Sequence, residues 1–172
     1  MEIYLAVLRF LHIGAGIIWI GLLYYFNLVH VPSMPKMEAP ARANAVMVLL
    51  PRALLFFRHA AWATVGLGLL WFLAHGFDLG WDVYTKTASF KAIVVGGTLG
   101  TIMMLNVWVF IWPNQKKIIA ATTATVTRQV PAPPEQPRWA RTALLASRTN
   151  VMLSVPMLFF MVASAHLPSL WA

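Results

Sequence analysis

The chain has 172 residues, of which 60% are apolar and only 10% charged, and its mean hydropathy is +0.71. Soluble domains carry roughly a quarter of charged residues, so this composition excludes an ordinary water-soluble fold. The net charge of +8 comes from Lys and Arg that lie mostly between apolar blocks, which predicts no nucleic-acid partner, and the lack of cysteine excludes disulfides, thiolate metal sites and covalent CxxCH haem attachment within the chain.

Four apolar segments are long enough to cross the hydrocarbon core of a bilayer, which takes about 20 helical residues. They are approximately residues 4–28, 54–77, 90–112 and 144–167. A bilayer offers no partner to an unpaired backbone group, and these runs are too long for barrel strands, so each is predicted to be a helix. The predicted fold class is all-α, with residues 1–172 forming one domain, an integral membrane four-helix bundle.

The connecting segments predict how the bundle lies in the membrane. Residues 38–50 are expected to form a short interfacial helix before Pro51. The third connection begins at Pro113, can continue as helix, and breaks at a proline-rich connector at about 129–138. Loops one and three carry most of the basic residues, and cytoplasmic loops retain such residues. We therefore expect a multi-pass protein of a bacterial inner membrane, with a cytoplasmic proline-rich connector and both termini outside.

The first span carries the most specific polar pattern in the sequence. Arg9, His12, Gly16 and Trp19 are spaced three or four residues apart and so share one helix face. An imidazole can ligate a b-type haem, Gly16 leaves room beside such a ligand, and Arg9 can pair with a haem propionate. The simpler interpretation is that Gly16 allows close helix packing and His12 bonds to a neighbouring helix.

A second axial ligand is harder to choose from the sequence. His59 is the most deeply embedded of the other histidines, whereas His75 and His166 lie nearer the outer edge. None of them matches the depth of His12, which lies roughly 12 Å below the outer edge at a rise of about 1.5 Å per residue. His59, His166 and a five-coordinate haem all remain open.

Other polar or small residues have competing interpretations. Lys91 either extends toward the lipid headgroups or holds an anion such as a propionate. Gly96 and Gly100 predict close helix packing, and this small-residue face is also where we expect contact with a partner or a second copy. Asn106 and Asn150 are expected to bond across helices or to a buried cofactor.

A family resemblance rests on three stretches of the sequence, residues 8–21 in the first span, 106–117 in the third and 147–168 in the fourth. With them the chain resembles the urate oxidase N-terminal membrane-domain family, the membrane part of a bacterial urate oxidase whose C-terminal portion is a c-type cytochrome. The resemblance implies a four-helix haem-binding module that uses His12, with His166 the matching residue in the last span. The chain departs from the family in having no CxxCH motif and in having Thr149 where the family tends to have a histidine.

The leading functional prediction is a haem b membrane protein for electron transfer, acting alone or as an accessory subunit of a larger respiratory or redox complex. In it, His12 ligates iron, His59 or His166 completes the axial pair, and Arg9 and Lys91 hold propionates. The expected partners are the lipid bilayer, a c-type cytochrome or larger membrane redox complex, and a second copy in a homo-oligomer. The first alternative is a membrane oxidoreductase acting on a urate-like or tetrapyrrole substrate, and the second is a non-redox structural or assembly subunit.

Overall fold

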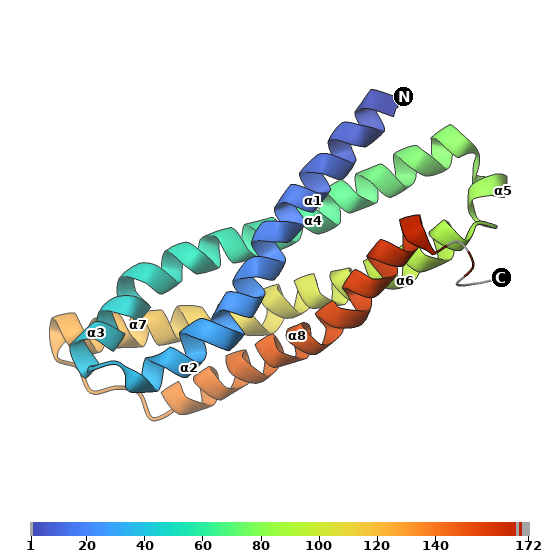
Figure 1. Cartoon of the computed structure of the whole chain (residues 1–172). Coiled ribbons are helices and arrows are strands. Elements are labelled where there is room, and N and C mark those ends of the chain that lie inside the picture. Colours follow the sequence, from blue (N-terminus) through green and yellow to red (C-terminus); the bar gives the residue numbers. More distant parts are fainter. Residues whose placement is uncertain (1, 168, 170–172) are drawn as a thin grey trace.

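The computed structural model describes residues 2–167 and residue 169, and within these it is all-helical, with no strand. Four long helical segments run back and forth, so that the first begins and the last ends at the same end of the bundle (Figure 1). We call this the α5 end, and the opposite end, with the connection between the first two segments and the proline-rich connector, the α3 end. The predicted all-α class with four helices is confirmed.

Each of the four segments is long and apolar enough to cross a membrane. The first comprises α1 (Glu2–Tyr24), η1 (Tyr25–His30), α2 (Val31–Ser33) and η2 (Met34–Lys36). The second comprises α3 (Ala39–Asn44), η3 (Ala45–Leu49) and α4 (Leu50–Leu79). After the short α5 (Trp81–Tyr84), the third comprises α6 (Ala88–Asn106), η4 (Val107–Ile111) and α7 (Trp112–Arg128), and the fourth is α8 (Gln136–His166).

Three π-helical turns explain how proline is accommodated inside these helices. The turns η1, η3 and η4 each end two residues before a proline, namely Pro32, Pro51 and Pro113. Proline lacks the N–H that would bond the carbonyl four residues earlier, and its ring would clash with that carbonyl. A wider turn at this position removes the clash and lets the helix continue. The stretch 38–50, predicted as a separate interfacial helix, is therefore continuous with α4 from Ala39 onward.

The connections are short and end at recognisable residues. Gly80 has φ of +85°, which an L side chain rarely adopts, and it separates α4 from α5. Thr87 caps α6 by accepting a hydrogen bond from the Phe90 N–H at 3.0 Å. The proline-rich connector is shorter than the predicted 129–138, because Pro137 lies in the first turn of α8, where its missing N–H costs nothing, and α8 begins at Gln136.

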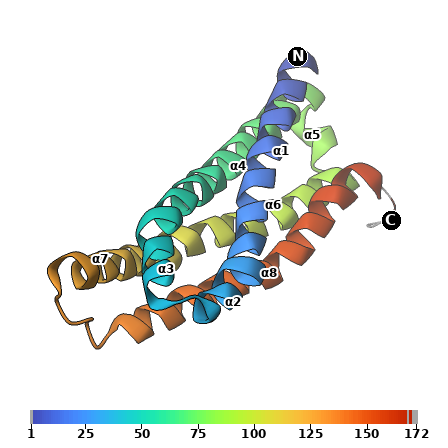
Figure 2. The ribbon, with the colours of Figure 1, turned by 60° about the vertical axis from the view of Figure 1, so that its left-hand side comes forward.

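The helices pack as two pairs that diverge toward the α5 end. The most extensive contacts join α1 to α4 and α6 to α8. Near the middle of the bundle, α1 is tied to α8 by a Tyr24–Ser154 hydroxyl pair at 3.1 Å, and Asn27 of η1 donates to Ser147 at 2.8 Å. From there α1 leans away from α8, as both ribbon views show (Figures 1 and 2).

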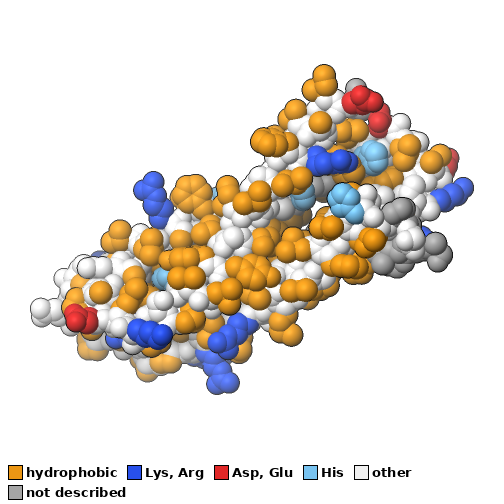
Figure 3. Space-filling model, in the orientation of Figure 1, with side chains coloured by type: hydrophobic (Ala, Val, Ile, Leu, Met, Phe, Trp, Pro, Cys, Tyr) orange, Lys and Arg blue, Asp and Glu red, His pale blue; other side chains and the backbone are white. Residues whose placement is uncertain are grey.

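The apolar surface and the small core fit helices surrounded by lipid. The core contains the fully buried side chains of Trp19, Leu23, Phe57 and Met103. By contrast Ile3 is 82% exposed, and apolar side chains cover most of the visible face (Figure 3). Soluble monomers rarely expose contiguous apolar patches of this extent.

Candidate functional site

The imidazole of His12 is held between α1 and α4. Its Nδ1 lies 2.7 Å from the backbone oxygen of Thr64. A Cβ placed on Gly68 would come within 2.8 Å of both Cε1 and Nδ1 of the imidazole, so the ring occupies space that only glycine leaves free. Helix α4 therefore supplies a hydrogen-bond acceptor, at Thr64, and the space for the ring, at Gly68. We call this pair of residues the His12 cradle.

This contact determines which ring nitrogen remains available. A carbonyl oxygen can only accept, so Nδ1 of His12 must carry the proton in its bond to Thr64. In the neutral imidazole the lone pair then lies on Nε2. Histidines that ligate metals almost always donate their other N–H to a carbonyl or carboxylate, so His12 is arranged as such ligands are.

Gly16 lies at the same helix interface. A Cβ on Gly16 would meet Cγ2 of Thr64 at 3.7 Å, an ordinary packing distance, so the approach of α1 to α4 does not require glycine at this position. The glycine beside the imidazole is Gly68, on the neighbouring helix.

His166 lies in the last turn of α8 and is exposed. The Tyr24–Ser154 hydrogen bond provides a common reference for its level. His12 and His166 each lie twelve residues from this bond toward the α5 end, or about 18 Å along their helices. The two histidines are thus equally far from that bond along helices that diverge toward the α5 end. Figure 3 shows His side chains around a hollow in this part of the molecule.

His59 lies elsewhere on α4. It is exposed, and its ring lies 6.2 Å from that of Trp108, edge to face. It precedes Gly68 by nine residues, which places it about 13 Å along α4 and about half a turn around it. The structure does not bring His59 and His12 together.

Arg9 begins a second polar cluster near the α5 end, one turn from His12. Its guanidinium carbon lies 4.8 Å from the centre of the Trp71 ring, a cation–π distance. Trp71 stacks on His75 with ring centres 4.7 Å apart, and His75 meets Tyr84 edge to face at 4.9 Å. Residues from α1, α4 and α5 thus form one continuous cluster.

Three buried polar atoms in this cluster have no hydrogen-bond partner among the described residues: Trp71 Nε1, His75 Nδ1 and Tyr84 Oη. Burial raises the pKa of Tyr84 to about 12, although the charge of Arg9 acts to lower it, so the hydroxyl stays neutral and able to donate. A buried unpaired donor costs about 1–3 kcal/mol. Three of the seven buried polar side-chain atoms without a partner among the described residues lie in this cluster.

Lys91 lies in the first turn of α6 at the same end, and its side chain is exposed. Lys91 was predicted either to hold an anion or to extend toward the lipid headgroups, and an exposed side chain allows both roles.

Two asparagines, the fully buried Asn150 and the half-buried Asn106, join α6 and α8. Asn106 donates to the Asn150 side-chain oxygen at 2.7 Å and to the Ala146 carbonyl at 2.8 Å, and Asn150 donates to the Met103 carbonyl at 3.0 Å. Their predicted bonding across helices is confirmed.

The small-residue face of α6 is also used within the bundle. A Cβ on Gly96 would lie 3.3 Å from the Met157 backbone oxygen, and both Gly96 and Gly100 are buried. The predicted close packing is confirmed, but the contact is with α8. Within the chain, α8 already covers the side of α6 that carries these two glycines.

No three His, Asp or Glu side chains converge on a common point within residues 2–167 and 169.

Several residues of the site were not predicted from the sequence. Thr64 and Gly68 are four residues apart on α4, a small-residue pair that was available as a signal. The place of Trp71 and Tyr84 in the site could not be predicted from the sequence, because each lies among other aromatic residues.

The fold and site thus define an all-helical protein with four helices of membrane-crossing length and an oriented histidine between the first two. Residues 41–172 match the family described as urate oxidase N-terminal, and the chain therefore belongs to that family. The match leaves α1 outside, and with it Arg9, His12 and Gly16. Comparison with curated proteins and with solved structures found no match.

Proposed function

We propose that this chain is an integral protein of a bacterial inner membrane that binds haem b through His12 and transfers electrons. The observation that carries the proposal is the Nδ1 contact of His12 with the Thr64 carbonyl, which leaves Nε2 available as a ligand. Haem supplies four nitrogen ligands and needs only one or two from the protein, so a single oriented imidazole is sufficient. When bound, the haem iron supplies one-electron oxidation and reduction.

In this proposal His166 would hold the haem iron together with His12. It is supported by its equal distance from the Tyr24–Ser154 bond and by its location on the helix that diverges from α1. His59 is omitted, because its exposed ring lies on a different side of α4 from the His12 cradle.

Arg9 and Lys91 hold the haem propionates in this proposal. Arg9 is one turn from His12 toward the α5 end, and Lys91 lies at that end on α6. The unpaired N–H of Trp71 and O–H of Tyr84 add neutral donors beside Arg9. A carboxylate would satisfy all of these groups, because it accepts only.

The α5 end faces outward in the proposed orientation. Most Lys and Arg residues lie in the segments at the α3 end, and basic loops remain in the cytoplasm. Both termini and the His12 site then lie toward the outer face. An electron partner on that side, such as a c-type cytochrome or a larger redox complex, follows from this geometry.

The proposal is tested by purifying the protein from haem-sufficient cells and recording a reduced-minus-oxidised visible spectrum and the pyridine haemochrome yield per chain. A b-type spectrum that disappears in His12→Ala supports it. A colourless wild-type preparation would overturn it and leave the structural or assembly role.

The family description supports a second candidate, a membrane oxidoreductase acting on urate or a related heterocycle. Urate consumption by membranes containing the chain, lost in His12→Ala, would favour this candidate over a simple electron carrier. Haem binding without urate turnover would favour the carrier.

A further inference from the structure

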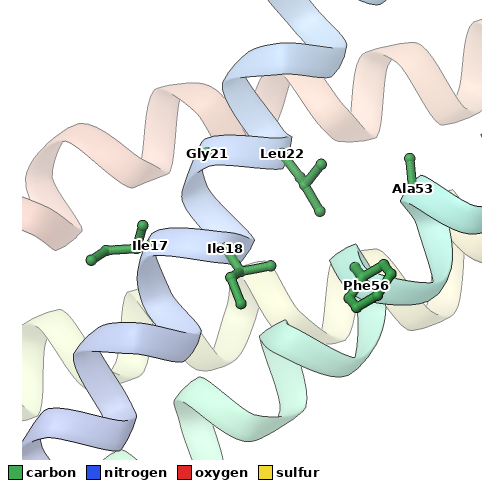
Figure 4. Close-up of a pocket in the computed structure, with 6 residues that line it drawn as sticks. All are labelled: Ile17, Ile18, Gly21, Leu22, Ala53 and Phe56. Atoms are coloured by element: carbon green, nitrogen blue, oxygen red, sulfur yellow. The ribbon is translucent and has the colours of Figure 1, made fainter.

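A continuous groove runs along the outer surface of the α1–α4 pair toward the α3 end. One part, of about 420 Å³, is lined by Ile17, Ile18, Gly21, Leu22, Ala53 and Phe56. A second part, of about 530 Å³, shares Ala53 and Phe56 with the first and extends past Arg52 and along η3 to Asn44. Figure 4 shows Ile18 and Leu22 of α1 pointing toward Ala53 and Phe56 of α4.

The groove is lined mostly by apolar side chains, and Phe56 and Val48 are 53% and 73% exposed. Its charged lining residue, Arg52, lies next to Ala53, which lines both parts, and Asn44 lies eight residues farther toward the α3 end. Arg52 forms no hydrogen bond or ion pair with another described residue, so its charge is available to an outside group.

Gly21 keeps the groove open. No atom lies within 4 Å of the place where a Cβ on Gly21 would be, so this glycine is not required by the packing of α1 against α4. The first part, between α1 and α4, has only apolar side chains in its lining, and Arg52 lies at its border toward the α3 end. This arrangement suits an acyl chain whose anionic headgroup lies at Arg52.

We propose that this groove binds one anionic phospholipid, with an acyl chain between α1 and α4 and its phosphate at Arg52. A helix from a second copy is the less suitable occupant, because its apolar side chains would leave the Arg52 guanidinium without an anion. Attraction of one basic side chain to an anionic lipid predicts a preference of roughly fivefold over a zwitterionic lipid.

The test uses the purified full chain in detergent micelles, titrated with dioleoylphosphatidylglycerol or dioleoylphosphatidylcholine, with bound lipid counted by native mass spectrometry. Wild type should bind one phosphatidylglycerol about fivefold more tightly than phosphatidylcholine. Arg52→Gln should bind both lipids equally, at the wild-type affinity for phosphatidylcholine. Gly21→Leu, which fills the groove, should bind neither lipid.

Gly97→Leu is the matched control, because Gly97 also has no atom within 4 Å of a Cβ but does not line the groove. It should bind lipid as wild type does, and its far-ultraviolet circular dichroism verifies folding of all variants. Unchanged lipid binding in Gly21→Leu would overturn the proposal. A wild-type dimer that Gly21→Leu converts to a monomer, without a change in lipid binding, would overturn it in favour of a second copy.

Discussion

The Nδ1 atom of His12 and the backbone oxygen of Thr64 lie 2.7 Å apart across the α1–α4 interface. This contact sets the tautomer of the imidazole and ties a side chain of one helix to the backbone of another. Gly68, one turn along α4, provides the space for the ring. The site therefore depends on the register between α1 and α4 as much as on the histidine itself.

Replacement of His12 by Ala is expected to abolish haem binding, because the proposed iron ligand is removed. The measurement is the pyridine haemochrome yield per purified chain. His59→Ala is the control and should keep the wild-type yield, since this exposed ring lies beside Trp108 and apart from the His12 cradle. Loss of haem in His59→Ala but not in His12→Ala would reverse the assignment.

Gly68→Ala should disturb the site without removing a ligand. The new Cβ would lie 2.8 Å from Nδ1 and Cε1 of His12, so the ring must move away from the Thr64 carbonyl. Loss of such a supporting bond weakens metal binding roughly 10- to 100-fold. Haem titration of apoprotein measures the change. Gly66→Ala is the matched control, because its Cβ would meet no atom within 4 Å, and equal effects of the two substitutions would contradict the cradle.

Asn150→Ala should destabilise the α6–α8 pair. Asn150 is fully buried, donates to Met103 and accepts from Asn106, so its loss also leaves the Asn106 amide with one partner fewer. We expect the free energy of unfolding in micelles to fall by about 1–2 kcal/mol. Asn114→Ala removes only a bond to its own helix at an exposed position and should change it by less than about 0.5 kcal/mol. Equal losses of unfolding free energy in the two variants would show that the Asn106–Asn150 contact adds no specific stability.

Tyr84 should make stability depend on pH in alkaline solution. Its pKa is about 12 in the folded protein, against about 10 in the unfolded chain. The folded state therefore favours the neutral phenol, and this contribution is present below pH 10 and lost as pH rises from about 10 to 12. Ultraviolet difference absorbance of tyrosinate, wild type against Tyr84→Phe, should show a titration centred near pH 12. A midpoint near 10 would show that the phenol is not desolvated.

Tyr84→Phe should leave the haem-free protein equally stable or more stable, by up to about 1 kcal/mol. The Tyr84 hydroxyl is buried without a partner, and removing an unpaired buried polar group relieves its desolvation cost. Thermal unfolding of the haem-free protein measures this. A clear loss of stability would mean that the hydroxyl already has a partner.

The four helices could be predicted from the sequence, because long apolar runs with few charges have only one regular solution in a bilayer. The first and last residues of each helix could not be predicted in this way. The π-helical turns before Pro32, Pro51 and Pro113 keep the helices continuous where proline normally signals an end. Gly96 illustrates the same limit, since its small size predicted close packing but not whether the neighbour would be α8 or another chain.

The sequence by itself determined that this is an all-helical chain with four membrane-length segments and a polar stripe containing Arg9 and His12. These properties follow from composition and from spacing along one helix, which any single helix must obey. Only the tertiary structure decided that His12 meets Thr64 and Gly68 and that His59 lies beside Trp108. Such relations depend on the rotation and register of one helix against another, and these are set by packing between side chains far apart in the sequence.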